Sequence, residues 1–324
     1  EYGLPALGIS DLMNEFGLVK FYKACRSAGI KPVGAADVWI GNPNAPDKPF
    51  RAMLVIRNDA GYLRLSELLT AAYVGKDRNV HHAELNPEWL ENGDNSGLIC
   101  LSGAHYGEVG VNLLNGNEDA ARAAALKYAA WFPDAFYLEL QRLPERPEWE
   151  ACVSGSVKLA EELGLPVVAT HPTQFMSRDD FNAHEARVCI AGGWVLTDKK
   201  RPRDFTPSQF FIPPETMLER FADLPEALEN TVEIAKRCNI HITLGKNFLP
   251  LFPTPDGLSL DDYLVKLSNE GLQERMVQLY PDEAERAAKM PEYQERLDFE
   301  LNIIIQMKFP GYFLIVQDFI NWAK

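Results

Sequence analysis

The chain lacks several features that would assign it quickly to a class of proteins. None of its apolar runs approaches the ~18 residues that a membrane-spanning helix needs, and the longest, such as residues 313–316, are short. No signal peptide is expected, because the sequence opens without a basic segment or a cleavage site. The 5 cysteines are far apart and odd in number. They predict buried, reduced thiols in a cytoplasmic protein rather than a disulfide framework, and no membrane association.

Catalytic motifs and basic charge are also scarce. The sequence has no Gly-x-Ser-x-Gly turn, no Walker-type phosphate loop and no Cys-x-x-Cys pair. Its 32 Lys and Arg against 46 Asp and Glu give a net charge of -14, of which residues 239–324 carry -5, from 8 basic and 13 acidic residues. A surface that grips a phosphate backbone usually needs a basic face. Neither part of the chain is therefore predicted to form a DNA channel by itself.

A repeated local pattern is present instead. Residues 164–171 consist of a glycine suited to closing a helix, a proline that prevents further helix, a β-branched and apolar run, and then polar residues. Residues 3–11 and 29–37 follow the same pattern. Repeated alternation of such strands with helices predicts an α/β fold with a largely parallel sheet, open or closed into a barrel. Chemistry in such folds is placed at the carboxyl ends of strands, which here end in Asp11, Asp37 and Thr170-His171.

The pattern changes after residue 179. Helices in residues 180–191, 214–221 and 224–237 predict a helical cap, and a second boundary near residue 238 precedes a proline-rich stretch and three further helices. The predicted domains are residues 1–238 and 239–324, and both ends are expected to lie inside a longer protein. A basic loop in the cap is either a solvated loop or a contact for DNA or a partner subunit; it contains Lys199, Lys200, Arg201 and Arg203.

Several stretches, taken in order, resemble the bacterial DNA polymerase III alpha subunits, a family of replicative polymerases. These stretches are residues 17–22, 29–32, 101–103, 136–140, 164–170, 200–203, 230–235, 248–253 and 309–316. The resemblance implies a distorted (β/α)7 barrel of the polymerase-and-histidinol-phosphatase (PHP) type, with its first strand missing, followed by the start of the polymerase palm. It also implies a DNA-directed DNA polymerase as the parent protein, with Mg²⁺ as its metal. The implied partners are the proofreading exonuclease (epsilon) subunit, other holoenzyme subunits and, through the parent, DNA.

The barrel departs from the metal-binding members of that family at several ligand positions. Leu12 stands where they have His, Asp37 where they have Glu, and Arg51 where they have His. Their Asn-Asp-x-His motif reads His171-Pro172-Thr173-Gln174. A guanidinium cannot be deprotonated in proteins and cannot act as a metal ligand. The sequence therefore predicts a vestigial site without metal, made of Asp11, Asp37, Arg51, His105, His171 and Gln174.

Three functions remain open at this stage. The first is an inactive PHP scaffold that docks the exonuclease, with no catalytic residue and no bound cofactor in this stretch. The second is a metal-dependent phosphoesterase or pyrophosphatase that keeps a residual site on Asp11, Asp37, His105 and His171. The third is a DNA-binding module, which the net charge of -14 disfavours.

Overall fold

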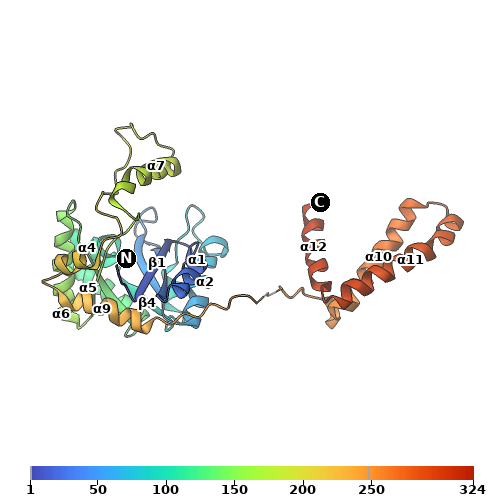
Figure 1. Ribbon diagram of the computed structural model, residues 1–324, viewed down its shortest axis with the longest axis horizontal. Helices are drawn as coiled ribbons and strands as arrows, with labels where there is room; N and C mark the ends of the chain where they lie inside the picture. Colours follow the sequence, from blue (N-terminus) through green and yellow to red (C-terminus); the bar gives the residue numbers. More distant parts are fainter. Residues whose placement is uncertain (1, 247–248) are drawn as a thin grey trace. The chain divides into compact units, whose positions relative to one another are not determined.

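The computed structural model describes residues 2–246 and 249–324, so Phe248, part of one resembling stretch, lies outside the described residues. The chain divides into two compact units, Glu1–Ile242 and Thr243–Lys324 (Figure 1). The sequence pattern predicts a domain boundary at residue 238. Among the described helices, none alone is long and apolar enough to cross a membrane, and one pair of helices passes that test only when combined across a 115° bend.

The first unit is built on a curled sheet of six strands, whose spatial order follows the sequence. The predicted mixed α/β, barrel-like fold is confirmed. The strands are β1 (Ala6–Leu12), β2 (Lys31–Ile40), β3 (Phe50–Ile56), β4 (Leu98–Leu101), β5 (Phe136–Gln141) and β6 (Val167–Thr170).

The sheet is less parallel than the sequence predicts. Three of the five strand pairings are parallel, but β3 runs antiparallel to both β2 and β4. For β2 and β3 the reason is the connection between them, residues 41–49, which contains no helix. A connection that short joins two strands as a hairpin, whereas a parallel pair needs a longer crossover.

Helices pack around the sheet, and the buried apolar residues between them form a large cluster and a smaller one around Phe221. The pattern in residues 164–171 behaves as predicted. Gly164 ends the helix before it with a left-handed φ of 67°, and β6 begins after Pro166. The helices of this unit are α1 (Leu18–Ser27), α2 (Asp59–Val74), α3 (Pro87–Glu91), α4 (Glu108–Leu114), α5 (Glu118–Trp131), α6 (Glu150–Leu163), α7 (Phe181–Gly192), α8 (Pro214–Arg220) and α9 (Pro225–Arg237).

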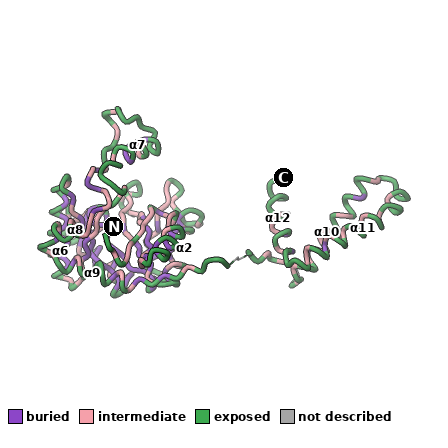
Figure 2. Tube along the Cα trace, viewed as in Figure 1, coloured by how far each residue is buried: buried purple, intermediate pink, exposed green. Residues whose placement is uncertain are grey.

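The second unit consists mainly of α10 (Leu260–Leu279), α11 (Glu283–Gln306) and α12 (Pro310–Ala323). Pro291 is a typical first residue of a helix, but α11 begins two turns before it, at Glu283. Asp282 caps the helix by accepting a hydrogen bond from the Glu285 amide, and residues 283–290 are good helix formers. Pro291 therefore lies inside the helix. The burial pattern differs between the units, with most buried positions in the first (Figure 2).

Candidate functional site at the strand ends

The strand register separates the two aspartates that the sequence places together. In the parallel pair of β1 and β2, Asp11 lies opposite Ala36, and Leu12 lies opposite Asp37. Because successive side chains of a strand point to opposite faces, Asp11 and Asp37 point to opposite faces of the sheet. Asp11 accepts a hydrogen bond of 2.8 Å from the amide of Gly17, which precedes α1. Its carboxylate thus fixes the start of a helix, where a negative charge is favourable.

Asp37 is held by Arg51 from the neighbouring strand. Arg51 lies opposite Trp39, two residues beyond Asp37 on the same face of β2. Its Nη2 and Nε donate to Oδ2 and Oδ1 of Asp37 at 2.5 and 3.3 Å, a two-point contact. The side chains are only 21% and 13% exposed. Burial alone would lower the pKa of Arg51, but Asp37 and, less strongly, Glu139 raise it overall. A permanent cation therefore occupies the position of an expected ligand.

Glu139, on β5, is buried deeper in the same site. Thr170 Oγ1 and Gln141 Nε2 both donate to its Oε1, at 2.5 and 3.0 Å. The amide of Glu139 in turn donates to Ser102 Oγ at 2.9 Å. Burial raises the pKa of Glu139, and its hydrogen bonds and Arg51 only partly offset that rise. The carboxyl group is thus committed to a network that ties β5 to β6.

His105 is a packed, neutral imidazole. It lies in a short 3₁₀ turn after Gly103, a residue with a left-handed φ of 77°, and stacks on Trp149 with ring centroids 3.6 Å apart. Burial, then the charges of Arg51 and Arg146, lower the pKa of His105 to about 3. Within the described part of the chain, neither ring nitrogen has a hydrogen-bond partner.

His171 and Gln174 are also engaged within the fold. The Nε2 of His171 lies 3.0 Å from the Phe210 carbonyl, and its Nδ1 lies 3.2 Å from Nη1 of Arg220. This arrangement requires Nε2 to donate and Nδ1 to accept. Burial and the charge of Arg220 lower the pKa of His171 to about 4, so the ring is neutral. The backbone amide of Gln174 donates to the backbone carbonyl of Gln209 at 2.8 Å. In residues 2–246 and 249–324, no three His, Cys, Asp or Glu side chains gather as a metal site would require.

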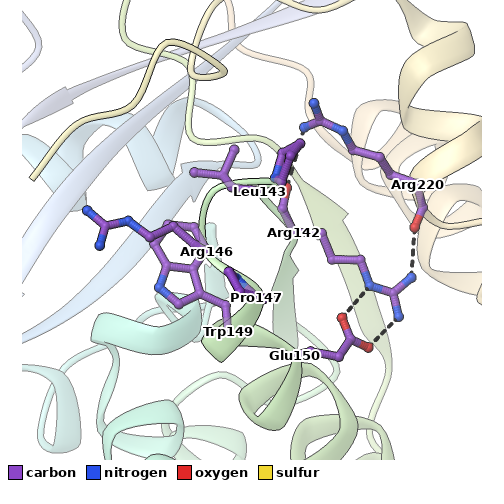
Figure 3. Close-up of a pocket in the computed structure, with 8 residues that line it drawn as sticks. Arg142, Leu143, Arg146, Pro147, Trp149, Glu150 and Arg220 are labelled. Carbon is purple, nitrogen blue, oxygen red and sulfur yellow. Dashed lines mark hydrogen bonds and ion pairs between the residues drawn. The ribbon is translucent and has the colours of Figure 1, made fainter.

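Beside these strand ends lies a cavity of about 400 Å³ that the sequence analysis does not identify (Figure 3). Three arginines line it, Arg142, Arg146 and Arg220. The first two differ in their hydrogen-bond partners. Arg142 is bound by Glu150 and Asp223, and their hydrogen bonds raise its pKa. The guanidinium of Arg146 points away from Arg142 (Figure 3), and its buried Nε has no partner among the described residues. The sequence signals only part of this cavity, because Arg142 and Arg146 follow the apolar run of β5 whereas Arg220 lies on α8.

Comparisons with protein families and with individual proteins point to the same kind of protein along the chain. The PHP domain family matches residues 1–143, and the family described as the bacterial DNA polymerase III alpha NTPase domain matches residues 262–324. Aligned over all 324 residues, the chain is 98% identical to a DNA polymerase III subunit alpha of Neisseria meningitidis serogroup A. The alignment covers 28% of that relative.

The chain is highly similar, over its full length, to the N-terminal region of DNA polymerase III alpha subunits.

Two more distant relatives, DNA polymerase III subunits alpha of Pseudomonas fluorescens and Escherichia coli K12, are each 48% identical over 99% of the chain, which covers 27% of each. The chain thus spans little more than a quarter of the curated relatives that it matches. The match to the PHP family covers β1 to β5 and includes Asp37, Arg51 and Glu139.

The basic loop of the cap lies between the two matched regions. Its four basic residues are not equivalent. The Arg201 side chain is 7% exposed and forms an ion pair of 2.5 Å with Glu185 of α7, whose side chain is 6% exposed. Lys199, Lys200 and Arg203 are exposed. Arg201 therefore holds the loop on the cap, and its three neighbours remain the candidates for an outside contact.

Proposed function

We propose that the first unit is a PHP barrel without metal that serves as a scaffold in a DNA polymerase III alpha subunit and docks the proofreading exonuclease subunit. The second unit would begin the polymerase palm. The observation that carries this proposal is the two-point contact between Arg51 and Asp37 at the strand ends.

The donor set at the strand ends does not fit the metal cluster of the PHP family. A divalent ion there would face the guanidinium of Arg51, which cannot lose its proton. Asp11 is turned to the start of α1, and the lone pair of His171 Nδ1 accepts from Arg220. Each of these contacts would have to break before the residue could bind a metal, so the barrel is better suited to a structural role than to metal-dependent hydrolysis.

A docked exonuclease would benefit from such a scaffold. Tethering two activities on one particle turns the second encounter into an intramolecular event at high effective concentration. DNA synthesis by the whole subunit would use two Mg²⁺ ions about 4 Å apart, clamped by carboxylates. We assign none of those carboxylates to this chain. Other holoenzyme subunits and DNA would be reached through the whole subunit.

Binding of the purified exonuclease subunit to residues 1–324 tests the scaffold role. We expect saturable binding of one exonuclease per chain, with an affinity that is the same in EDTA and in Zn²⁺ or Mn²⁺. Full-length alpha subunit is the positive control. Binding by the full-length subunit but not by residues 1–324 would place the docking surface elsewhere.

A metal-dependent phosphoesterase acting on nucleotides or pyrophosphate is the competing function. One observation favours it: the cavity beside the strand ends is lined by Arg142, Arg146 and Arg220, and guanidinium groups bind phosphate well. The test is phosphate release in the presence of Mn²⁺ or Zn²⁺. Turnover that is lost in Asp37→Ala would support the hydrolase and reject the scaffold.

A further inference from the structure

A second cavity in the first unit, of about 330 Å³, plays no part in the site described above. One wall is the turn after β1, with Asn14 and Glu15. The opposite wall is one face of α2, where Ser66, Thr70 and Tyr73 follow each other at helical spacing. Cavities of this size lie at the lower end of the range that buries small ligands or single side chains.

Glu15, on the wall of this cavity, has one carboxyl oxygen without a hydrogen-bond partner among the described residues. Its Oε1 is buried and accepts no hydrogen bond from any described residue. Its Oε2 lies 3.4 Å from Ser66 Oγ, but that hydroxyl is closer, at 2.9 Å, to the carbonyl of Tyr62. A hydroxyl has one proton, so Ser66 cannot satisfy both acceptors. A buried acceptor left without a partner costs about 1–3 kcal/mol, more if it is charged.

The charge balance around Glu15 points to a cation from outside the unit. Burial raises the pKa of Glu15 to about 7, and the single opposing influence is the hydrogen bond from Ser66. No described Lys or Arg pairs with this carboxyl group. The other ionisable side chain on the cavity wall is the phenol of Tyr73. The cavity thus offers negative charge without a counter-charge.

The surroundings of the cavity are typical of a protein contact. Phe16, next to Glu15, is 79% exposed, and Val74 and Tyr73 on the cavity wall are 71% and 48% exposed. Long cationic side chains suit this combination, because their stems pack on apolar surface while their ends reach a charge. Arginine in a desolvated pocket is also a common anchor of protein interfaces.

We propose that this cavity receives a lysine or arginine side chain of the docked exonuclease subunit, whose charged end pairs with Glu15 while its stem lies against Leu69 and Tyr73. This inference rests on the scaffold function proposed above. It adds a location and a chemical requirement to that function, namely a basic anchor residue on the partner.

The pairing makes docking depend on pH in a defined direction. In the free subunit Glu15, with a pKa of about 7, is largely protonated at pH 6 and ionised at pH 8. A bound cation favours the carboxylate and lowers its pKa, so docking below pH 7 must release a proton. The affinity should therefore rise about tenfold from pH 6 to pH 8 and then level off.

The test is a titration of full-length alpha subunit with the purified exonuclease subunit at pH 6, 7 and 8. Glu15→Gln keeps the shape of the side chain and removes its charge. We expect at least tenfold weaker binding by this variant at pH 8 and loss of the rise between pH 6 and pH 8. Glu67→Gln is the matched control, because Glu67 lies on α2, the other wall of the cavity, but is 70% exposed and pairs with Arg64. It should bind like the wild type at each pH.

The outcomes separate the two proposals. If wild-type subunit binds the exonuclease and Glu15→Gln binds with the same affinity and pH dependence, the cavity assignment is overturned and the scaffold function stands. If wild-type subunit does not bind at all, both are overturned. A thermal unfolding curve of each variant identifies any loss of binding that comes from misfolding.

Discussion

The two units of the chain bury their apolar residues to different extents. In the first, a large cluster joins the strands to the surrounding helices, and a smaller one surrounds Phe221. In the second, the buried residues of the cluster are three leucines, Leu264, Leu301 and Leu314. Large apolar side chains on α12 stay exposed, among them Phe319 at 55% and Trp322 at 89%.

This difference shows which unit supplies its own stability. Burial of apolar surface is the main favourable contribution to folding, and a small unit buries a smaller share of its surface. The first unit also contains the buried polar side chains found among the described residues, including Glu139 and Gln141, whereas the buried side chains of the second are apolar. The barrel therefore has a complete core around a polar centre, and the helices of the second unit have little core of their own.

Of the tests of this comparison, separating the units should show the largest difference in unfolding behaviour. Residues 1–242 should unfold in urea in one cooperative transition, followed by far-UV circular dichroism and tryptophan fluorescence. Residues 243–324 should show a broad transition or none, because their core is too small to offset the lost chain entropy. An equally sharp transition in both pieces would remove the distinction drawn here.

Breaking the ion pair at the strand ends should have the next largest effect. Arg51→Ala leaves the buried carboxyl group of Asp37 unpaired, and should lower the free energy of unfolding of the first unit by about 3 kcal/mol. The matched control in the second unit is Arg296→Ala, which breaks an exposed pair with Glu300 one helical turn away. It should cost at most about 0.5 kcal/mol. Similar costs for the two changes would show that Arg51 and Asp37 form an ordinary surface pair.

The smallest effect concerns the pH dependence of the first unit. Burial raises the pKa of Glu139 in the folded protein above its unfolded value, so the wild type loses stability as pH rises between the two values. Glu139→Gln does not titrate. Its stability relative to the wild type should increase from pH 4 to pH 8, because only the wild type has to release this proton in the folded state. Urea unfolding at several pH values measures this, and a difference that falls with pH would mean that Arg51 holds Glu139 ionised.

Much of the fold could be predicted because its signals are local. Gly164 and Pro166 mark a helix end and a strand start within a few residues, and the structure has both. Predictions failed where the answer depended on a neighbour distant in sequence. Asp11 and Asp37 both occur near strand ends, but a register shift of one residue places them on opposite faces.

In the candidate site, too, the sequence did not reveal contacts between residues that are distant in the chain. Arg51 could be identified as a cation near the strand ends, because its charge does not depend on context. The arginine cavity could not, because it needs Arg220 of α8 beside Arg142, 78 residues earlier. Likewise, the basic loop gave no sign that Arg201 pairs with Glu185.

The central claim is that the Arg51–Asp37 contact leaves the strand ends unable to hold divalent ions. The most direct measurement is the metal content of the purified chain after incubation with Zn²⁺ or Mn²⁺ and removal of the free ion. We expect far less than one ion per chain, and the same value for Asp37→Ala. One or more tightly bound ions per chain, lost in Asp37→Ala, would contradict the account.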